Sequence, residues 1–269
     1  MEGDGNAAAL RRSLGGVFSG FDVTFDERWR LGFAGGYTRS SLHVDDRTST
    51  GAVDNYHLGL YGGGQLGMIG LRSGIAQTWH DVAMDRAIAF SSGELCCAST
   101  FGDSVKADYR GRTMQAFGEV GVGYSAGRTI IEPFANAAYV NVHTDGFTES
   151  GGAAALAVNG HSSDAVFTTL GTRVTITHVL ADSATISTYG MFGWQHAFGD
   201  ITPAMTMAFA SGGSGFNIGG NPLARNAALV EAGMNVRLSP TATIDLSYIG
   251  QLSDRETDHA IRGNLIWRF

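Results

Sequence analysis

The sequence predicts an all-β protein, an antiparallel up-and-down β-barrel that spans a membrane. The last strand gives the first reason, because residues 258–269 alternate apolar and polar side chains and end on an aromatic residue. Successive side chains of a strand point to opposite faces, so one face of this strand carries Ile261, Leu265, Trp267 and Phe269. In a membrane barrel, lipid covers such a face and the polar face lines the lumen.

The second reason is that alternating segments follow one another along the whole chain. Eleven segments have this pattern: 14–25, 29–43, 52–65, 67–84, 107–126, 129–146, 162–180, 183–200, 224–238, 241–254 and 258–269. Short turns are predicted at 26–27, 64–66, 126–128, 181–182 and 240–241, and longer loops at 44–51, 85–106, 147–161, 201–223 and 253–257. Short turns on one side and long loops on the other are typical of an outer-membrane barrel, in which the short turns are periplasmic.

Composition agrees with this fold. The chain of 269 residues has 39 glycines and 4 prolines, and no apolar run approaches the roughly 18 residues of a spanning helix. A helical membrane protein is therefore excluded. Lys106 is the only lysine, and arginine suits a polar lumen because its planar fork binds several carboxylates and stays charged. The net charge of -7 argues against a positively charged surface that would bind nucleic acid.

The odd number of segments predicts that one strand lies upstream of Met1. A single-chain bacterial barrel normally has an even number of strands. Residues 3–12 would then form an extracellular loop, and a sheet of the visible strands alone would leave two unpaired edges in lipid. Residues 1–6 are polar and do not resemble a signal peptide. We therefore expect residues 1–269 to be one barrel domain, truncated at its amino-terminal side.

Short motifs along the chain resemble the translocator domain of classical monomeric autotransporters, the proteins of type V secretion. They are Gly3–Asn6, Leu14–Asp22, Trp29–Tyr37, Tyr56–Gly63, Phe117–Glu119, Glu132–Ala135, Gly193–Gly199 and Trp267–Phe269. The resemblance covers essentially the whole chain. It implies a twelve-stranded barrel with a linker helix through the lumen and a secreted passenger. This sequence departs from the family in lacking the passenger, the linker helix and the Trp- and Gly-rich first strand.

Charged residues within the strands predict a polar lumen. If Phe117 and Glu119 share the inner face, Val120, Val122 and Tyr124 face lipid, where arginine at the midplane costs about 2–4 kcal/mol. The same alternation predicts these lumen-facing residues: Asp22, Arg30, Arg72, Glu119, Glu132, Arg173, Glu231, Arg237, Asp245 and Arg262. Two interpretations remain open. The charges fill a wet lumen, or some of them contact the linker helix or the chain in transit: Glu119, Glu132, Glu231 and Arg173.

Other candidate chemistry is weak, and we predict no catalytic, metal or cofactor site. The adjacent Cys96 and Cys97 fit neither spaced metal ligands nor an ordinary loop-closing disulfide. They would form a strained vicinal disulfide or stay free, and an incidental pair is favoured over a redox site. His80 and Asp81, with Asp85 nearby, could be drawn as an acid–base pair, but a polar cluster at the end of a strand is the favoured interpretation.

The sequence therefore predicts an outer-membrane barrel, not an enzyme, that supports the export of an amino-terminal passenger domain to the cell surface and anchors it. The expected partners are the passenger, the linker helix, the lipid bilayer and the outer-membrane assembly machinery, with no nucleic acid, and the barrel is expected to be a monomer. The resemblance implies that the machinery recognises the last strand through Leu265, Trp267 and Phe269. The alternatives are a barrel enzyme, such as a phospholipase or protease, and a passive diffusion pore.

Overall fold

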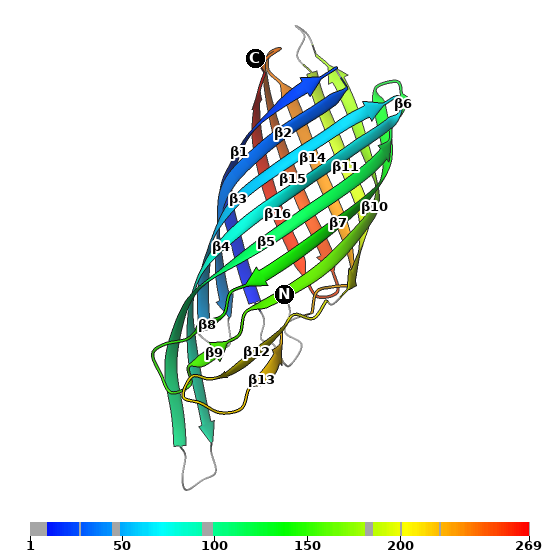
Figure 1. Cartoon of the computed structure of the whole chain (residues 1–269). Coiled ribbons are helices and arrows are strands. Elements are labelled where there is room, and N and C mark those ends of the chain that lie inside the picture. The colour runs from blue at the N-terminus through cyan, green and yellow to red at the C-terminus, as the bar shows by residue number, and fades with distance from the viewer. Residues whose placement is uncertain are drawn as a thin grey trace.

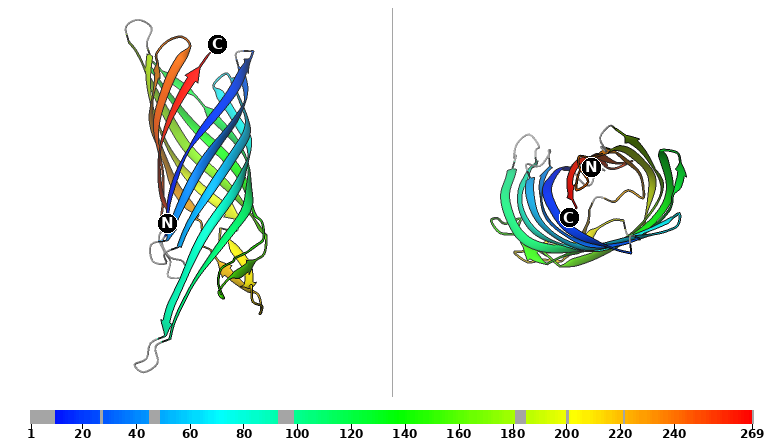
Figure 2. Two further views of the ribbon diagram at one scale, coloured as in Figure 1. Left: turned by 90° about the vertical axis from the view of Figure 1, so that its left-hand side faces the viewer. Right: turned by 90° about the horizontal axis from the view of Figure 1, so that it is seen from above.

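One large antiparallel sheet, curled into a tall barrel, makes up most of the protein (Figure 1 and Figure 2). The computed structural model describes residues 10–26, 28–44, 49–92, 99–180, 185–199, 201–220 and 222–268. The sheet contains, in hydrogen-bonded order, β1 (Leu10–Phe25), β2 (Trp29–Val44), β3 (Ser49–Leu66), β4 (Ile69–Ser92), β5 (Ser99–Val122), β7 (Thr129–Thr144), β10 (His161–Val179), β11 (Thr185–Gly199), β14 (Asn226–Arg237), β15 (Ala242–Ser253) and β16 (Thr257–Trp267). The short β6 (Tyr124–Ala126) also pairs with β7. Within these residues, no helix is long and apolar enough to cross a membrane.

The observed fold confirms the prediction of an antiparallel β-barrel, and the eleven long strands correspond to the eleven alternating segments. Each long strand pairs with its neighbour in sequence, as an up-and-down barrel requires. The short turns lie at the same end as the carboxy-terminal part of β16, and the long connections lie at the other end (Figure 1). By the general rule for such barrels, the end with the short turns is periplasmic and the end with the long connections is extracellular.

The structure corrects several predicted boundaries. The turn between β3 and β4 is Gly67 and Met68 rather than 64–66, because strand pairing continues as far as Leu66 and Ile69. Gly67 has a φ of 63°, which suits a tight hairpin turn. Gly64 is a glycine for another reason. A Cβ at this position would lie 2.3 Å from the ring of Trp29, so the glycine makes room for the indole.

The segments predicted as the loops 85–106, 147–161 and 201–223 also contain strands. The first is largely part of β4 and β5, whose hairpin projects beyond the barrel at the extracellular end (Figure 1). The other two contain β8 (Phe147–Thr148), β9 (Leu156–Val158), β12 (Ala204–Phe209) and β13 (Phe216–Gly219). These four strands form a second small sheet in the order β13-β12-β9-β8, which we call the rim sheet.

The two faces of the barrel wall differ in polarity. Exposed apolar side chains share the convex face, among them Phe21, Leu31, Phe33, Leu60, Val120, Leu170, Phe192, Leu246, Ile261 and Leu265. Buried polar side chains share the concave face, among them Thr38, Asn55, Thr78, Thr169, Thr243 and Asp245. This is the pattern of a lipid-embedded barrel, where lipid replaces the covering layer that a soluble sheet would need.

Aromatic side chains on the convex face form two belts. Tyr37 pairs in register with Tyr56, and Tyr56 with Trp79, so the three rings lie in one row across the middle of β2, β3 and β4. Phe25 and Trp29 pair at the periplasmic ends of β1 and β2, so the Tyr37 row lies on the extracellular side of this pair. Aromatic girdles at both interfaces flank the apolar band of outer-membrane barrels. Residues midway between the two belts therefore lie near the membrane midplane.

β1 and β16 are the two ends of the sheet, and in the described part of the chain no strand pairing joins them. Their side chains nevertheless meet at the extracellular end. The Arg12 guanidinium lies 3.2 Å from a carboxylate oxygen of Asp258. The two ends of the curled sheet are therefore linked by an ion pair rather than by a ladder of backbone hydrogen bonds.

Candidate functional site

Four charged side chains meet on neighbouring strands inside the barrel. Arg72 on β4 is the register partner of Glu119 on β5, and Arg173 on β10 is the register partner of Glu132 on β7. Because β5 pairs with β7, these four strands are consecutive in the sheet. We call the four side chains the charge cluster.

Every member of the charge cluster contacts both residues of opposite sign. Arg72 donates to Glu119 over 2.7 Å and to Glu132 over 2.7 and 3.1 Å. Arg173 donates to Glu119 over 2.7 and 2.8 Å and to Glu132 over 3.1 Å. The Glu119 side chain is only 7% exposed. The Arg173 guanidinium also lies 3.9 Å from the centre of the Phe134 ring, a cation–π contact.

These contacts show which face of the sheet carries the cluster. Arg72 reaches Glu132 across the intervening β5, and Arg173 reaches Glu119 across β7. Side chains converge on the concave side of a curled sheet and diverge on the convex side, so contacts that skip a strand belong to the concave side. Gly121 leaves the space for this convergence, because a Cβ there would lie 2.8 Å from the Glu132 carboxylate.

The other charged residues singled out by the sequence form separate groups. Arg30 pairs with Asp22 at 3.2 Å, and Arg262 donates to Glu231 over 2.8 Å. Asp245 accepts hydrogen bonds from Tyr189 at 2.9 Å and from Asn264 at 3.0 Å. Arg237 is the last residue of β14, and its side chain is exposed. The structure thus brings four of the ten predicted residues into one cluster and distributes the others around the wall.

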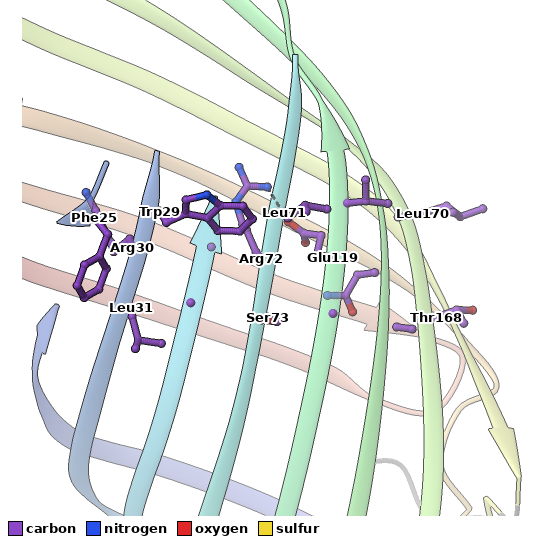
Figure 3. A pocket seen from close by; sticks show the side chains of 17 residues that line it. Phe25, Trp29, Arg30, Leu31, Leu71, Arg72, Ser73, Glu119, Thr168 and Leu170 are labelled. Atoms are coloured by element: carbon purple, nitrogen blue, oxygen red, sulfur yellow. Dashed lines mark hydrogen bonds and ion pairs between the residues drawn. The ribbon is translucent and has the colours of Figure 1, made fainter. Parts of the chain in front are cut away.

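Two hollows flank the wall beside the charge cluster. One, of about 810 Å³, lies on the concave side and is lined by polar groups that include Arg30, Tyr61, Arg72, Glu119 and Arg173. The other, of about 910 Å³, is lined mainly by apolar side chains of the opposite face, including Trp29, Leu31, Leu71, Val120 and Leu170. Figure 3 shows Trp29 and Leu31 on the near side of the strands and Arg72 and Glu119 beyond them. The larger hollow is a groove in the lipid-facing surface, whereas the charged one opens into the barrel.

Sequence reasoning missed a polar network on the concave side of β2 to β5. His57 hydrogen-bonds Thr38 and Thr78, each at 2.9 Å. His80 hydrogen-bonds Asn55 at 2.6 Å and Thr113 at 2.8 Å, and Asn55 also donates to Thr38 at 3.1 Å, which joins the two halves. Strand alternation could have revealed this network, because its side chains lie on the same face of the sheet as Arg72 and Glu119.

The favoured interpretation of His80, Asp81 and Asp85 as one polar cluster is wrong. His80 points to the concave side, whereas Asp81 points to the convex side and pairs with Arg110 at 3.3 Å. Asp85 pairs with Lys106 at 3.1 Å. Adjacent residues of a strand face opposite ways, which separates the imidazole from the neighbouring carboxylate. Cys96 and Cys97 lie outside the described residues.

The curled sheet, the two aromatic belts, the apolar convex face and the charged interior define the class of protein: an outer-membrane β-barrel. Residues 1–249 match the family model of the Autotransporter beta-domain, and the chain belongs to this family. The resemblance seen in the sequence is thereby confirmed. As a member of this family, the protein is an outer-membrane barrel of type V secretion.

Similar proteins agree with this assignment. The chain is 35% identical over 267 residues to a protein of Serratia marcescens called Extracellular serine protease. The aligned region covers 99% of this chain and 25% of that relative. The chain therefore spans a quarter of the length of its relative. Among solved structures it is similar to the translocator domain of autotransporter NalP from Neisseria meningitidis, with a TM-score of 0.74, 15% identity, and coverage of 97% of this chain and 82% of that chain. The beta domain of the Bordetella autotransporter BrkA gives a TM-score of 0.67 at 18% identity, covering 97% and 92%. These two likenesses show the fold.

Proposed function

We propose that the chain forms one translocator domain that moves a passenger, joined to its amino-terminal side, through the concave interior and then anchors it at the surface. The observation that carries this proposal is the polarity of the wall. The concave side presents paired charges and hydrogen-bonded polar groups from β1 to β16, while the convex side between the two aromatic belts is mainly apolar. Leu10 begins β1 at the end with the long connections, opposite the end of β16, so a passenger joined there would stand outside the cell (Figure 1).

The charge cluster is proposed to brace the wall rather than to grip the moving chain. Its two carboxylates and two guanidiniums neutralise one another, and the Glu119 side chain is 7% exposed. Each carboxylate already accepts from two arginines, so little of its hydrogen-bonding capacity is left for a passing peptide. A rigid and internally neutral wall lets an extended chain slide without being held. We propose the same lumenal position for the other predicted charged residues, from Asp22 to Arg262.

We place no catalysis in this chain and propose that it needs no cofactor. The described residues contain no group of three side chains able to hold a metal ion. The relative from Serratia marcescens is called a serine protease, and the chain matches only 25% of its length. We assign any such activity to the passenger. We further propose that the barrel works as a monomer in the lipid bilayer.

The function can be tested by joining this chain to a passenger of known sequence. The chain would replace the matching quarter of the Serratia marcescens relative, and protease added to intact cells would report whether the passenger is at the surface. We expect the passenger to be digested from outside and to stay inside the cell when a stop codon replaces the chain. A correctly folded barrel with the passenger retained in the periplasm would contradict the proposal. That result would favour one of the two alternative functions: a diffusion pore, detected by solute uptake, or a barrel enzyme, detected by phospholipid hydrolysis.

The last strand should also carry an assembly signal that the outer-membrane assembly machinery reads. Leu265 and Trp267 are 71% and 64% exposed on the convex face of β16, and Phe269 lies outside the described residues. We expect Trp267→Asp to reduce the yield of assembled barrel about fivefold or more, because it places a carboxylate in the aromatic girdle. Trp267→Phe keeps the aromatic face and should assemble normally. Heat-modifiability gels after pulse labelling measure both, and equal yields would refute the assignment.

A further inference from the structure

The groove of about 910 Å³ in the convex surface crosses five neighbouring strands, and its floor is a row of small side chains. Register pairs Gly62 of β3 with Ser73 of β4, and Ser73 with Gly118 of β5. Gly118 pairs in turn with Ala137 of β7, and Ala137 with Thr168 of β10. Residues that pair in register share one face of a sheet. We call this depression the lipid-facing groove.

Larger apolar side chains border the floor on both sides. The neighbouring row on the periplasmic side carries Trp29, whose indole lies over Gly64, and then Leu71, Val120 and Leu170. The neighbouring row on the extracellular side carries Leu60, Ile75, Tyr139 and Val166. Each row lies about 7 Å from the floor along the strands, because side chains of one face repeat every two residues. The groove is therefore narrow and has apolar walls.

The floor of the groove is open above Gly118. A Cβ at this position would meet no atom of the described residues within 4 Å, apart from its own chain neighbours. Gly62 and Gly118 pair in register on both sides, so their N–H and C=O groups are used within the sheet. A hydrocarbon can therefore lie against the floor without leaving a backbone polar group unpaired.

The groove rises from the periplasmic interface into the membrane. It starts beside Trp29, the first residue of β2, and ends at Thr168, near the middle of β10 (Figure 3). Four strand spacings of about 4.8 Å give the floor a length of about 19 Å. With strands tilted by about 35–45°, such a row rises by about 11–14 Å. This height is close to that of one leaflet, which is half of a hydrocarbon core about 30 Å thick.

We propose that the lipid-facing groove holds one acyl chain of a phospholipid from the periplasmic leaflet, which stays bound to the barrel. The head group would lie at the Trp29 end, since indole rings favour the membrane interface. The chain would run over Gly62 and Gly118 toward Thr168. The proposal goes beyond the proposed function, because it concerns the outer face of the wall and does not depend on how a passenger crosses the interior.

A hydrocarbon chain fits this groove better than a second copy of the protein does. The groove belongs to the apolar convex surface that the outer membrane covers, so lipid is the neighbour that reaches it. Two barrels would meet with their convex faces, which touch along a narrow line and leave a depression unfilled. An unfilled depression loses dispersion contacts, whereas a flexible chain supplies them along the whole floor.

Native mass spectrometry tests the bound lipid in the chimeric protein that carries the passenger of the Serratia marcescens relative, extracted in a mild detergent. Gly118→Leu fills the floor and should lower the lipid-bound fraction about fivefold or more, because leucine takes the place of buried methylene groups of the lipid. Gly190→Leu is the matched control and should retain the phospholipid. Gly190 lies on the convex face of β11 outside the groove, and a Cβ there makes only an ordinary 3.7 Å contact with Glu231.

Three results of this experiment would overturn the proposal. The first is an equal lipid-bound fraction for the unsubstituted chain and for Gly118→Leu, with heat-modifiability gels verifying that both barrels are folded. The second is a retained glycolipid of the outer leaflet, which its mass would identify. The third is a dimer that disappears with Gly118→Leu, because a second copy of the chain would then fill the groove.

A photoreactive phospholipid tests the position of the chain without any substitution. The chimeric protein is placed in vesicles of phosphatidylethanolamine, a small fraction of which has a diazirine in one acyl chain, and adducts are mapped by peptide mass. Adducts at Ser73, Gly118 and Ala137 should be about threefold or more as frequent as adducts around Gly190, because a retained chain stays beside the floor while bulk lipid exchanges. Even labelling of the convex face would mean that only bulk lipid covers the groove, and would overturn the proposal. If Gly118→Leu prevented barrel assembly, this result would decide alone.

Discussion

Replacing Phe33 with arginine is expected to lower the free energy of unfolding of the barrel by about 2–4 kcal/mol. Phe33 lies on the convex face of β2, midway between Trp29 and Tyr37 of the two aromatic belts, and is 48% exposed. Its side chain is therefore at the depth where lipid contains no water to solvate a guanidinium. Urea unfolding of the barrel in lipid vesicles, followed by gel mobility, measures the change.

The control for this prediction is the next residue along the strand. Ala34 lies at nearly the same depth but points to the concave side, where water and polar groups are present. We expect Ala34→Arg to change the free energy of unfolding by less than about 1 kcal/mol. Equal effects of the two substitutions, or a larger effect at Ala34, would mean that the faces of β2 have been assigned the wrong way round.

Removal of Glu119 is expected to destabilise the barrel by about 3 kcal/mol. Glu119 accepts hydrogen bonds from both Arg72 and Arg173, and its side chain is 7% exposed. Glu119→Leu would leave two guanidiniums facing each other with the single carboxylate of Glu132. The loss should therefore exceed that of an ordinary surface ion pair, which contributes about 0–1 kcal/mol.

Arg30 provides the comparison for Glu119. Its side chain is 58% exposed and makes one ion pair, with Asp22, so Arg30→Leu should cost no more than about 1 kcal/mol. The double substitution Glu119→Leu with Arg173→Leu should lose less stability than Glu119→Leu alone. The reason is that Arg173, which Glu119→Leu leaves uncompensated, is removed as well. Urea unfolding measures all three variants. A loss at Glu119 no larger than that at Arg30 would show that the charge cluster does not brace the wall.

The sequence by itself was enough to predict the barrel and its eleven long strands. Lipid on one side and a wet interior on the other require side chains to alternate with a period of two, and residues 258–269 show this requirement directly. The same constraint predicts, without a structure, that Glu119 faces the lumen and Val120 faces lipid. Strand ends were less certain because glycines such as Gly64 resemble turn residues, although Gly64 is required by the Trp29 ring that lies over it.

Only the tertiary structure showed the rim sheet. β9 and β12 pair although the long strands β10 and β11 separate them in sequence, and each is too short for its own alternation to be recognised. The projecting β4–β5 hairpin contacts the β8 end of this sheet, for instance through Arg86 and Glu149. A pairing between distant segments leaves no periodic signal in either one.

In the charge cluster too, the sequence predicts some features and only the structure shows the others. Alternation along each strand predicted that Arg72 and Arg173 point inward, but it could not predict that both would contact Glu119 and Glu132. The sequence predicts the direction of each side chain because the period of a strand is local. The tertiary structure decided which side chains meet, because contacts that skip a strand depend on the curvature of the curled sheet.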